Sequence, residues 1–311
     1  MPKQISDNKV VLTSSAVSVG DVTINLTAGI ITGSTVMFAQ ALQGLSDLIT
    51  SGLLLYGVGR SKQKTNTKFQ FGYGREIFFW VLMAGIIMFL GTGLISIVIG
   101  FQQFSDPKAI QSVYLALAIL VFNLVSNGYA FSLSVRRLKE QSPHARSWWS
   151  RIVRSSIVET KATFFIDLLG TLAAVIGLCA IGALLLTGDA RLDGIGSMAI
   201  GIAMMLAAVF LIYDVREFIV GRAASPKLEQ TIIMTVEKVA SVHRVLDLRT
   251  MYLGSGKLLI IIEVHLRNDM TTDSIEKTID GIKRDVNQSI PGSHHIQVEV
   301  ETPDEELLAG S

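Results

Sequence analysis

Cysteine and charged residues are both scarce in this sequence. The only cysteine among the 311 residues is Cys179, which lies inside an apolar run, so neither a disulfide framework nor a cysteine metal cage can form within one chain. Charged residues make up 17% of the chain, against roughly 25% in an average soluble domain, and half of the residues are hydrophobic. This composition is typical of a membrane protein.

Other missing features exclude further classes of function. The formal net charge is only +1 and the basic residues cluster in loops, so we expect no nucleic-acid partner and take the lipid bilayer as the expected partner. The sequence has no recognisable pairing of nucleophile and base, no phosphate-binding glycine loop and no dinucleotide fingerprint, since Phe71–Gly74 follows a basic loop and not a strand. We therefore expect a transporter and not an enzyme.

Six segments are long and apolar enough to cross a bilayer core of about 30 Å, which requires roughly 20 residues of helix. They cover residues 11–31, 35–58, 78–101, 112–135, 157–187 and 193–214. The first is the least apolar, because Asp21 and Asn25 lie within it. The sequence thus predicts an α-helical membrane protein with a transmembrane domain of six helices at residues 1–215.

Lysine and arginine are unevenly distributed among the loops. The stretch GRSKQKTNTKFQFGYGRE and the connection after residue 135 are rich in both, whereas the other connections offer only Lys108 and Arg191. Cytoplasmic loops carry the excess of these residues, so the two basic loops are expected in the cytoplasm. With six spans, both termini are then cytoplasmic.

Residues 216–311 have the pattern of a separate soluble domain. The stretch SPKLEQTIIMTVEKVASV begins with a Ser-Pro helix start, two strand-like stretches follow at 245–254 and 257–267, and a helix with a capping start and a last strand complete the domain. The order α-β-β-α-β predicts a small cytoplasmic, ferredoxin-like α+β domain. Its core is modest, so we expect it to pair with a second copy and form a homodimer.

Two carboxylates interrupt the apolar segments. Asp47 stands about 12 residues from either end of its segment, where an ionised Asp costs about 2.5–3.5 kcal/mol and must face water, a partner or a cation. Gln43 lies one turn earlier on the same helical face, and Thr163 and Asp167 repeat this spacing in the fifth segment. If the two helices pack together, the four side chains converge, and the two carboxylates balance one divalent cation.

A second interpretation of both carboxylates stays open at this point: they would be hydrogen-bonded residues that pack helices together. Asp21 with Asn25 and Asn123 with Asn127 form two further pairs four residues apart, for which hydrogen bonding between helices is an adequate explanation. In the cytoplasmic domain, the metal-binding residue types are Glu263, His265, His294, His295 and Glu299. They fix no coordination geometry, so we favour dimerisation over metal sensing as the role of this domain.

The stretch GSTVMFAQALQGLSDLITSGLLLYGVG, with the FGYGRE loop after it, resembles the second helix and following loop of the cation diffusion facilitators, the zinc-transporter family. LVSNGYAF and DGIGSMAIGIAMMLAAVFLIYDVREFIVGRAASP extend the resemblance, which is greatest to the branch containing the mammalian zinc transporter number nine and its bacterial relatives. It implies a dimeric, six-helix secondary transporter in the bacterial inner membrane. Such proteins export a divalent cation from the cytoplasm in exchange for protons.

The resemblance also places the family's transport site on the same four positions of the second and fifth helices. Gln43 replaces the usual His or Asp, and Thr163 stands where many zinc-transporting members have His. Asn25 and Asn127 replace a basic and an acidic residue and are expected to surround the site without being primary ligands. Each departure substitutes a neutral group for a charged or imidazole group.

These neutral groups bear on the choice of cation. Zinc favours nitrogen and sulfur ligands, whereas a set of oxygen ligands suits harder ions such as manganese. We expect no resident cofactor, and zinc, manganese, iron and cobalt all stay open as the transported cation. The alternatives are a non-transporting or atypical member that acts as a partner subunit or scaffold, and a carrier of another ion.

Overall fold

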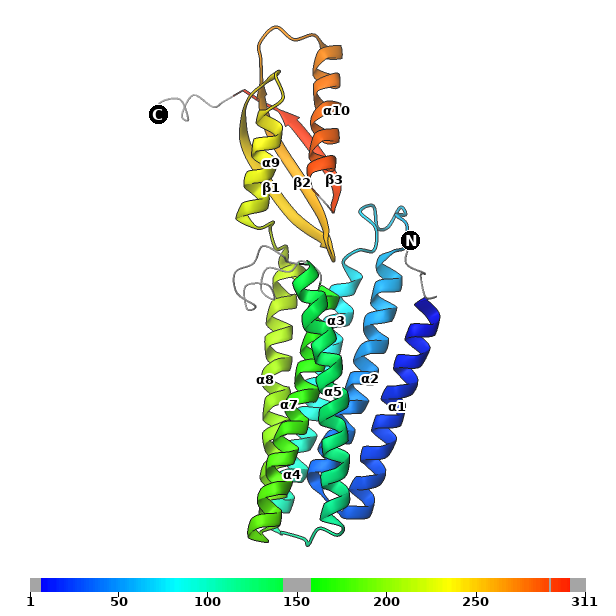
Figure 1. The fold of residues 1–311 in the computed structure, drawn as a ribbon. Helices are drawn as coiled ribbons and strands as arrows, with labels where there is room; N and C mark the ends of the chain where they lie inside the picture. Colours follow the sequence, from blue (N-terminus) through cyan, green and yellow to red (C-terminus); the bar gives the residue numbers. More distant parts are fainter. Residues whose placement is uncertain (1–6, 142–157, 291, 303–311) are drawn as a thin grey trace, which may run out of the picture. The chain divides into compact units, whose positions relative to one another are not determined.

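The computed structural model describes residues 7–141, 158–290 and 292–302 (Figure 1). The chain divides into two compact units, one formed by residues 1–59 and 77–216 and the other by residues 60–76 and 217–311. Arg146, Arg151 and Arg154, which contribute to the second predicted cytoplasmic loop, lie outside the described residues.

Long helices make up the first unit (Figure 1). They are α1 (Asp7–Thr32), α2 (Thr35–Ser61), a continuous run of α3 (Glu76–Ile87), η1 (Met88–Leu94) and α4 (Ile95–Ser105), then α5 (Val113–Gln141), α7 (Val158–Thr187) and α8 (Arg191–Val220). Each overlaps one predicted segment. Among the described residues, four stretches are long and apolar enough to cross a membrane: Glu76–Ser105, Val113–Arg136, Lys161–Thr187 and Arg191–Val220. That α1 and α2 also cross stays a prediction.

Paired glycines bring the segment η1–α4 close to α8. A β-carbon on Gly100 would lie 2.6 Å from the carbonyl oxygen of Gly194, and a β-carbon on Gly201 would lie 2.6 Å from the carbonyl oxygen of Gly93. On both helices the glycine recurs after about two turns. Small residues at such contacts let helix backbones approach closely in membranes, so these four positions set the distance between the two helices.

The first residues of α8 hold the turn between α1 and α2. Gly33 has a φ of 69°, a left-handed conformation that favours glycine. The buried carboxylate of Asp193 accepts hydrogen bonds from Ser34 Oγ (2.5 Å), Thr35 N (2.6 Å), Thr35 Oγ1 (2.7 Å) and Val36 N (3.2 Å). N–H groups at a helix start have no partner within the helix, so Asp193 supplies one and fixes the start of α2 to α8.

The second unit contains a three-stranded sheet and two helices. In chain order these are α9 (Pro226–Glu237), β1 (Val242–Gly254), β2 (Lys257–Leu266), α10 (Thr272–Ser289) and β3 (Ser293–Val300), as predicted. The central strand β2 pairs antiparallel with β1 and parallel with β3. Helices α9 and α10 contact each other, α9 contacts β1 and α10 contacts β3. Alternate β2 residues are buried, namely Leu258, Ile260, Ile262, Val264 and Leu266, and Leu259 between the first two is buried as well.

Both helices of this unit start where the sequence predicts. Ser225 is the N-cap of α9 and Pro226 is its first residue, a position that suits proline because its missing N–H needs no partner there. Thr271 caps α10 and accepts a hydrogen bond of 3.4 Å from Ser274 N.

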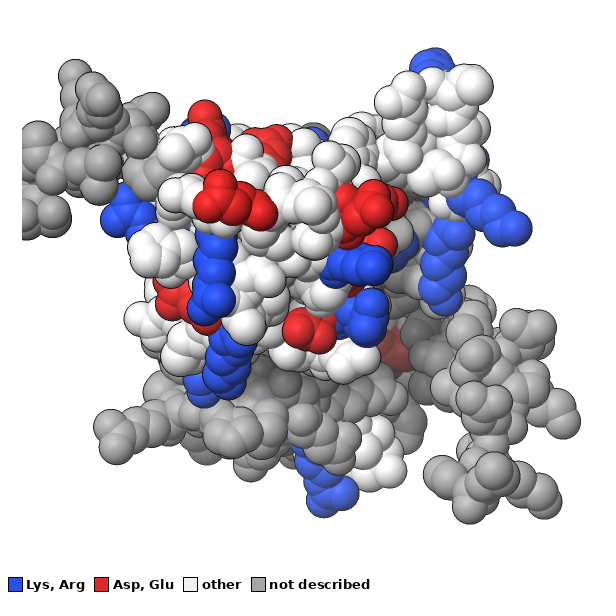
Figure 2. All heavy atoms as spheres, turned by 90° about the horizontal axis from the view of Figure 1, so that it is seen from above, with Lys and Arg blue, Asp and Glu red and all other residues white. Residues whose placement is uncertain are grey.

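In Figure 2, acidic and basic side chains are interspersed over the visible face and not gathered by sign.

Candidate metal-binding site

On α2, the side chains of Gln43 and Asp47 point the same way, as their spacing predicts. Gln43 Nε2 donates a hydrogen bond of 2.6 Å to Asp47 Oδ2. Gln43 is only 3% exposed and Asp47 is half-buried. Because this bond uses the amide nitrogen, the amide oxygen is the atom of Gln43 that can coordinate a cation.

On α7, Asp167 is half-buried and accepts a short hydrogen bond from Ser134 Oγ on α5. Thr163 lies one turn earlier and is also half-buried. Helix α5 therefore orients the carboxylate of Asp167. The participation of Thr163 in a cation site stays a prediction.

Aromatic side chains between these two positions hold α7 in place. The ring of Phe164 lies 5.5 Å from the ring of Phe131 on α5, and the ring of Phe165 lies 5.0 Å from the ring of Phe210 on α8. Phe164 and Phe165 are both buried. This packing fixes α7 against α5 and α8, and so fixes the direction of its polar side chains.

Helices α2, α5 and α7 meet at Gly170, one turn after Asp167. A β-carbon at Gly170 would lie 2.9 Å from Asn127 Oδ1 and 3.0 Å from Gln43 Nε2, so both amide side chains occupy the space that a larger residue would need. Gln43 and Asn127 thus lie together at Gly170, and the convergence of Asp47, Thr163 and Asp167 on one cation stays a prediction.

A hydrogen-bonded chain of polar residues joins α5 to α1. Asn123 Nδ2 donates to Asn25 Oδ1 at 2.7 Å, and Asn25 Nδ2 donates to Asp21 Oδ1 at 3.1 Å and to the Asp21 carbonyl at 2.9 Å. Asn25 and Asn123 are completely buried. Hydrogen bonding between helices was offered as the explanation of the pairs Asp21/Asn25 and Asn123/Asn127, and the structure shows it between one member of each pair, Asn25 and Asn123.

Two residues near the site, Asp21 and Ser134, were not predicted from the sequence as site residues. A β-carbon on Gly44, the residue that follows Gln43, would lie 3.4 Å from Asp21 Oδ2. Asp21 could have been recognised from the sequence, because it is a carboxylate within an apolar run. Ser134 carries no such signal, because serine is common in membrane helices as a small, polar packing residue.

The π-helical segment η1 braces α2 at the level of the site. Thr92 Oγ1 donates a hydrogen bond of 3.1 Å to the carbonyl of Leu42 and shares a short hydrogen bond with Ser46 Oγ. Leu42 and Ser46 directly precede Gln43 and Asp47. Single turns of π-helix occur frequently at functional sites, and this one fixes the α2 backbone from which both polar side chains extend.

The described residues contain no group of three or more His, Cys, Asp or Glu side chains that could hold a metal ion. The carboxylates of Asp21, Asp47 and Asp167 therefore do not form a single cluster. A cation bound between α2 and α7 would take neutral oxygen atoms beside its carboxylates. Amide and hydroxyl oxygens favour hard divalent cations.

In the second unit, acidic residues form a row across the sheet. Asp247, Glu263 and Glu299 are direct partners on β1, β2 and β3. Desolvation raises the pKa of Glu263, the carboxylates of Asp247 and Glu301 raise it further, and Arg249 acts in the opposite direction. On the same sheet, burial and the positive charge of Lys257 lower the pKa of His294.

Two family models match almost the whole chain. The cation efflux transmembrane domain matches residues 11–219, and the cytoplasmic domain of cation efflux proteins matches residues 224–303. The chain belongs to the cation efflux family. This confirms the expected family, and it confirms that the family is one of transporters and not of enzymes.

Several relatives in the cation efflux family are similar over most of the chain. The human proton-coupled zinc antiporter SLC30A9, a mitochondrial protein, is 29% identical over 280 residues, which cover 89% of this chain and 48% of the relative. Metal tolerance protein C4 of Arabidopsis thaliana is 20% identical over 87% of this chain and 68% of its own length. The chain spans about half the length of the SLC30A9 relatives that it matches.

A bacterial relative is matched over a larger share of its own length. The cation-efflux pump FieF of Klebsiella pneumoniae is 22% identical over 84% of this chain and 82% of its own length. Among solved structures, a nickel form of the MamM C-terminal domain is 18% identical with a TM-score of 0.24, covering 26% of this chain and 100% of that chain.

Proposed function

We propose that this chain exports a divalent metal cation from the cytoplasm by alternating access, in exchange for protons. The observation that carries the proposal is the contact of α2 with α7 at Gly170, where a β-carbon one turn after Asp167 would lie 3.0 Å from the Gln43 amide that donates to Asp47. An ionised carboxylate in an apolar helix is costly even when neutral groups donate hydrogen bonds to it, and two of them balance the charge of one divalent cation. A bound cation offsets this cost.

Each polar residue of the site has a role in this proposal. Asp47 and Asp167 are the charged ligands, and the amide oxygen of Gln43 and the hydroxyl of Thr163 are the neutral ones. The hydrogen bonds from Gln43 and from Ser134 orient the two carboxylates before the cation arrives. Asn127 lies beside Gln43 at Gly170, and Asn25 accepts a hydrogen bond from Asn123 on α5; we assign both a supporting role without binding of the cation.

Proton exchange follows from the same two carboxylates. After the cation leaves, two neighbouring negative charges repel each other, and the uptake of a proton by one of them relieves the repulsion. A new cation can bind with both charges available only when that proton leaves. Cation and protons therefore compete for one site, which is the requirement for their exchange.

The remaining parts of the proposal concern the membrane and the assembly. Residues 1–215 form six spans in a bacterial inner membrane, with both termini in the cytoplasm. Residues 216–311 form the cytoplasmic domain that holds two copies together as a homodimer. The uneven distribution of basic residues supports this orientation, and the match of residues 224–303 to a cytoplasmic domain supports the division of the chain.

Uptake into proteoliposomes with an imposed pH gradient tests the proposal, with zinc, manganese, iron and cobalt as separate substrates. We expect metal movement that depends on the proton gradient, and preference for manganese because the ligands are oxygens. Replacement Gln43→His adds an imidazole and should shift the preference toward zinc. If no metal moves although the protein is folded and inserted, the proposal that this chain transports a metal cation is wrong.

A second candidate function is that of a non-transporting partner subunit or scaffold. Neutral residues at Gln43, Asn25 and Asn127, where the resemblance leads us to expect charged or imidazole groups, favour it. Isothermal titration of the purified protein with the four cations separates the two functions. A transporter binds at least one cation at a site that Asp167→Asn weakens, whereas a scaffold binds none there. A carrier of another ion would move protons without metal.

A further inference from the structure

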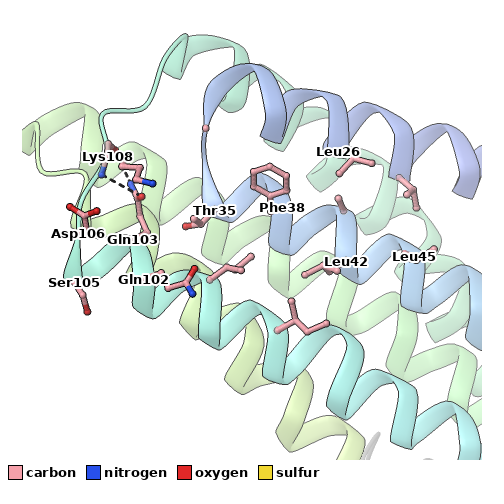
Figure 3. A pocket seen from close by; sticks show the side chains of 15 residues that line it. Leu26, Thr35, Phe38, Leu42, Leu45, Gln102, Gln103, Ser105, Asp106 and Lys108 are labelled. Atoms are coloured by element: carbon pink, nitrogen blue, oxygen red, sulfur yellow. Dashed lines mark hydrogen bonds between the residues drawn. The ribbon is translucent and has the colours of Figure 1, made fainter.

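A cavity of about 810 Å³ lies between α1, α2 and α4 (Figure 3). Its volume falls within the range of roughly 300–1,000 Å³ that is typical of sites for small molecules. Its apolar wall is formed by Leu26, Phe38, Leu42, Leu45, Ile95 and Ile99. Leu45 is 42% exposed and Ile95 is 44% exposed, so the cavity opens sideways at the surface of the helical unit.

The polar lining of this cavity gathers at one end (Figure 3). Asp106 and Lys108 lie there, in the exposed connection that follows α4. The buried amide of Gln103 holds this connection, since its Nε2 donates to the Lys108 carbonyl at 2.8 Å and its Oε1 accepts from Lys108 N at 3.4 Å. The backbone at Lys108 is thus held at the polar end of the cavity, where one acidic and one basic residue line it.

The length of the cavity matches one leaflet of a bilayer. Along α2 its lining runs from Thr35 to Leu45, a distance of about 15 Å at 1.5 Å per residue. This is half of a hydrocarbon core of about 30 Å. The polar end therefore lies at the depth of the lipid headgroups when the apolar end lies near the membrane centre.

We infer that this cavity binds one phospholipid with a zwitterionic headgroup. One acyl chain lies along the apolar wall, the phosphate pairs with Lys108, and the ammonium group pairs with Asp106. Both charges of the headgroup then meet an opposite charge, which a fatty acid or an anionic lipid does not achieve at Asp106. The inference requires the chain to lie in a membrane but does not depend on the proposed transport.

Native mass spectrometry of the full chain in detergent, titrated with phosphatidylethanolamine or with phosphatidylglycerol, tests this site. We expect one tightly bound phosphatidylethanolamine, and binding weakened by about tenfold in Lys108→Gln because a charge-assisted hydrogen bond is lost. Ile99→Trp fills the cavity and should abolish this binding. The matched controls are Arg191→Gln, which removes a basic residue outside the cavity, and Ile195→Trp, which enlarges an exposed α8 residue.

Equal lipid binding by Ile99→Trp and Ile195→Trp would overturn the inference, and so would equal affinity for the two lipids. A second measurement does not require any variant to fold. Phosphatidylethanolamine with a photoreactive group in its acyl chain should label α1, α2 and α4 at the cavity lining. Uniform labelling of all lipid-facing helices, or the same labelling by a photoreactive fatty acid, would contradict a phospholipid site.

Discussion

Gln43 on α2 packs directly against Gly170 on α7, where a β-carbon would lie 3.0 Å from Gln43 Nε2. The amide that contacts the glycine is the one that donates to Asp47, so the contact between the helices and the orientation of the carboxylate depend on each other. A change at Gly170 therefore acts on the candidate site without altering any proposed ligand.

Gly170→Ala should disturb this contact. The added methyl group would also lie 2.9 Å from Asn127 Oδ1, and overpacking of this kind costs about 1–3 kcal/mol. We expect a lower melting temperature in detergent and weaker cation binding by titration. The control is Gly182→Ala on the same helix, where a β-carbon meets nothing within 4 Å. Equal effects of both substitutions would show that the packing at Gly170 is unimportant.

A buried ion pair between α7 and α8 leads to a second prediction. Lys161 Nζ lies 2.9 Å from both carboxylate oxygens of Asp214, and the Lys161 side chain is 1% exposed. Removing one partner of a buried pair costs about 3–5 kcal/mol, so Lys161→Met should strongly destabilise the protein. The double variant with Asp214→Leu should recover much of this loss in thermal unfolding.

An exposed pair provides the control for that prediction. Arg249 and Asp247 are 2.7 Å apart, with side chains 76% and 40% exposed. Breaking an exposed pair costs about 0–1 kcal/mol, so Arg249→Met should change the stability little. A loss for Lys161→Met no greater than for Arg249→Met would rule out a structural role for the buried pair.

Asp193→Ala tests the link between α8 and the start of α2. The substitution removes the acceptor of four hydrogen bonds and leaves the N–H groups of Thr35 and Val36 without it, at a cost of roughly 2–4 kcal/mol. Hydrogen exchange at these two amides should accelerate more than exchange in the middle of α2. Asp189→Ala, which removes an exposed acceptor in the preceding turn, should leave both amides protected.

The raised pKa of Glu263 leads to a pH-dependent prediction for the second unit. A carboxyl whose pKa is higher in the folded state binds its proton more tightly there, so the free energy of unfolding falls as the pH rises through the raised value. Glu263→Gln should therefore stabilise the protein at about pH 7 and lose this advantage near pH 4, where the carboxyl is largely protonated in both states. The exposed Glu276→Gln is the control, and an advantage that persists in acid would contradict the mechanism.

Much of the fold was predictable from local patterns. Apolar runs marked the long helices, and the Ser-Pro start at Ser225 and the cap at Thr271 marked the two helices of the second unit. The glycine contacts between η1–α4 and α8 were not predictable, because nothing in one sequence states which helix a glycine will face. The π-helical turn at Thr92 also depends on packing that no local pattern encodes.

The candidate site was predictable to the extent that charge in an apolar run is conspicuous. Asp47 and Asp167 stood out for that reason, and the spacing of four residues correctly placed Gln43 beside Asp47. Asp21 had the same signal but was interpreted only as the partner of Asn25. Ser134 could not be found, since its role depends on α5 lying against α7 at the level of Asp167.

The central claim is that the charge of Asp47 is needed for cation export, and one measurement tests it most directly. Metal transport by Asp47→Asn in proteoliposomes isolates that charge, because asparagine keeps the size of the side chain and an oxygen that can accept the hydrogen bond from Gln43. Asp189→Asn in an exposed turn is the matched control. We predict that proton-driven metal transport is lost in Asp47→Asn and kept in the control. Transport by Asp47→Asn at the rate of the unmodified protein would contradict the claim.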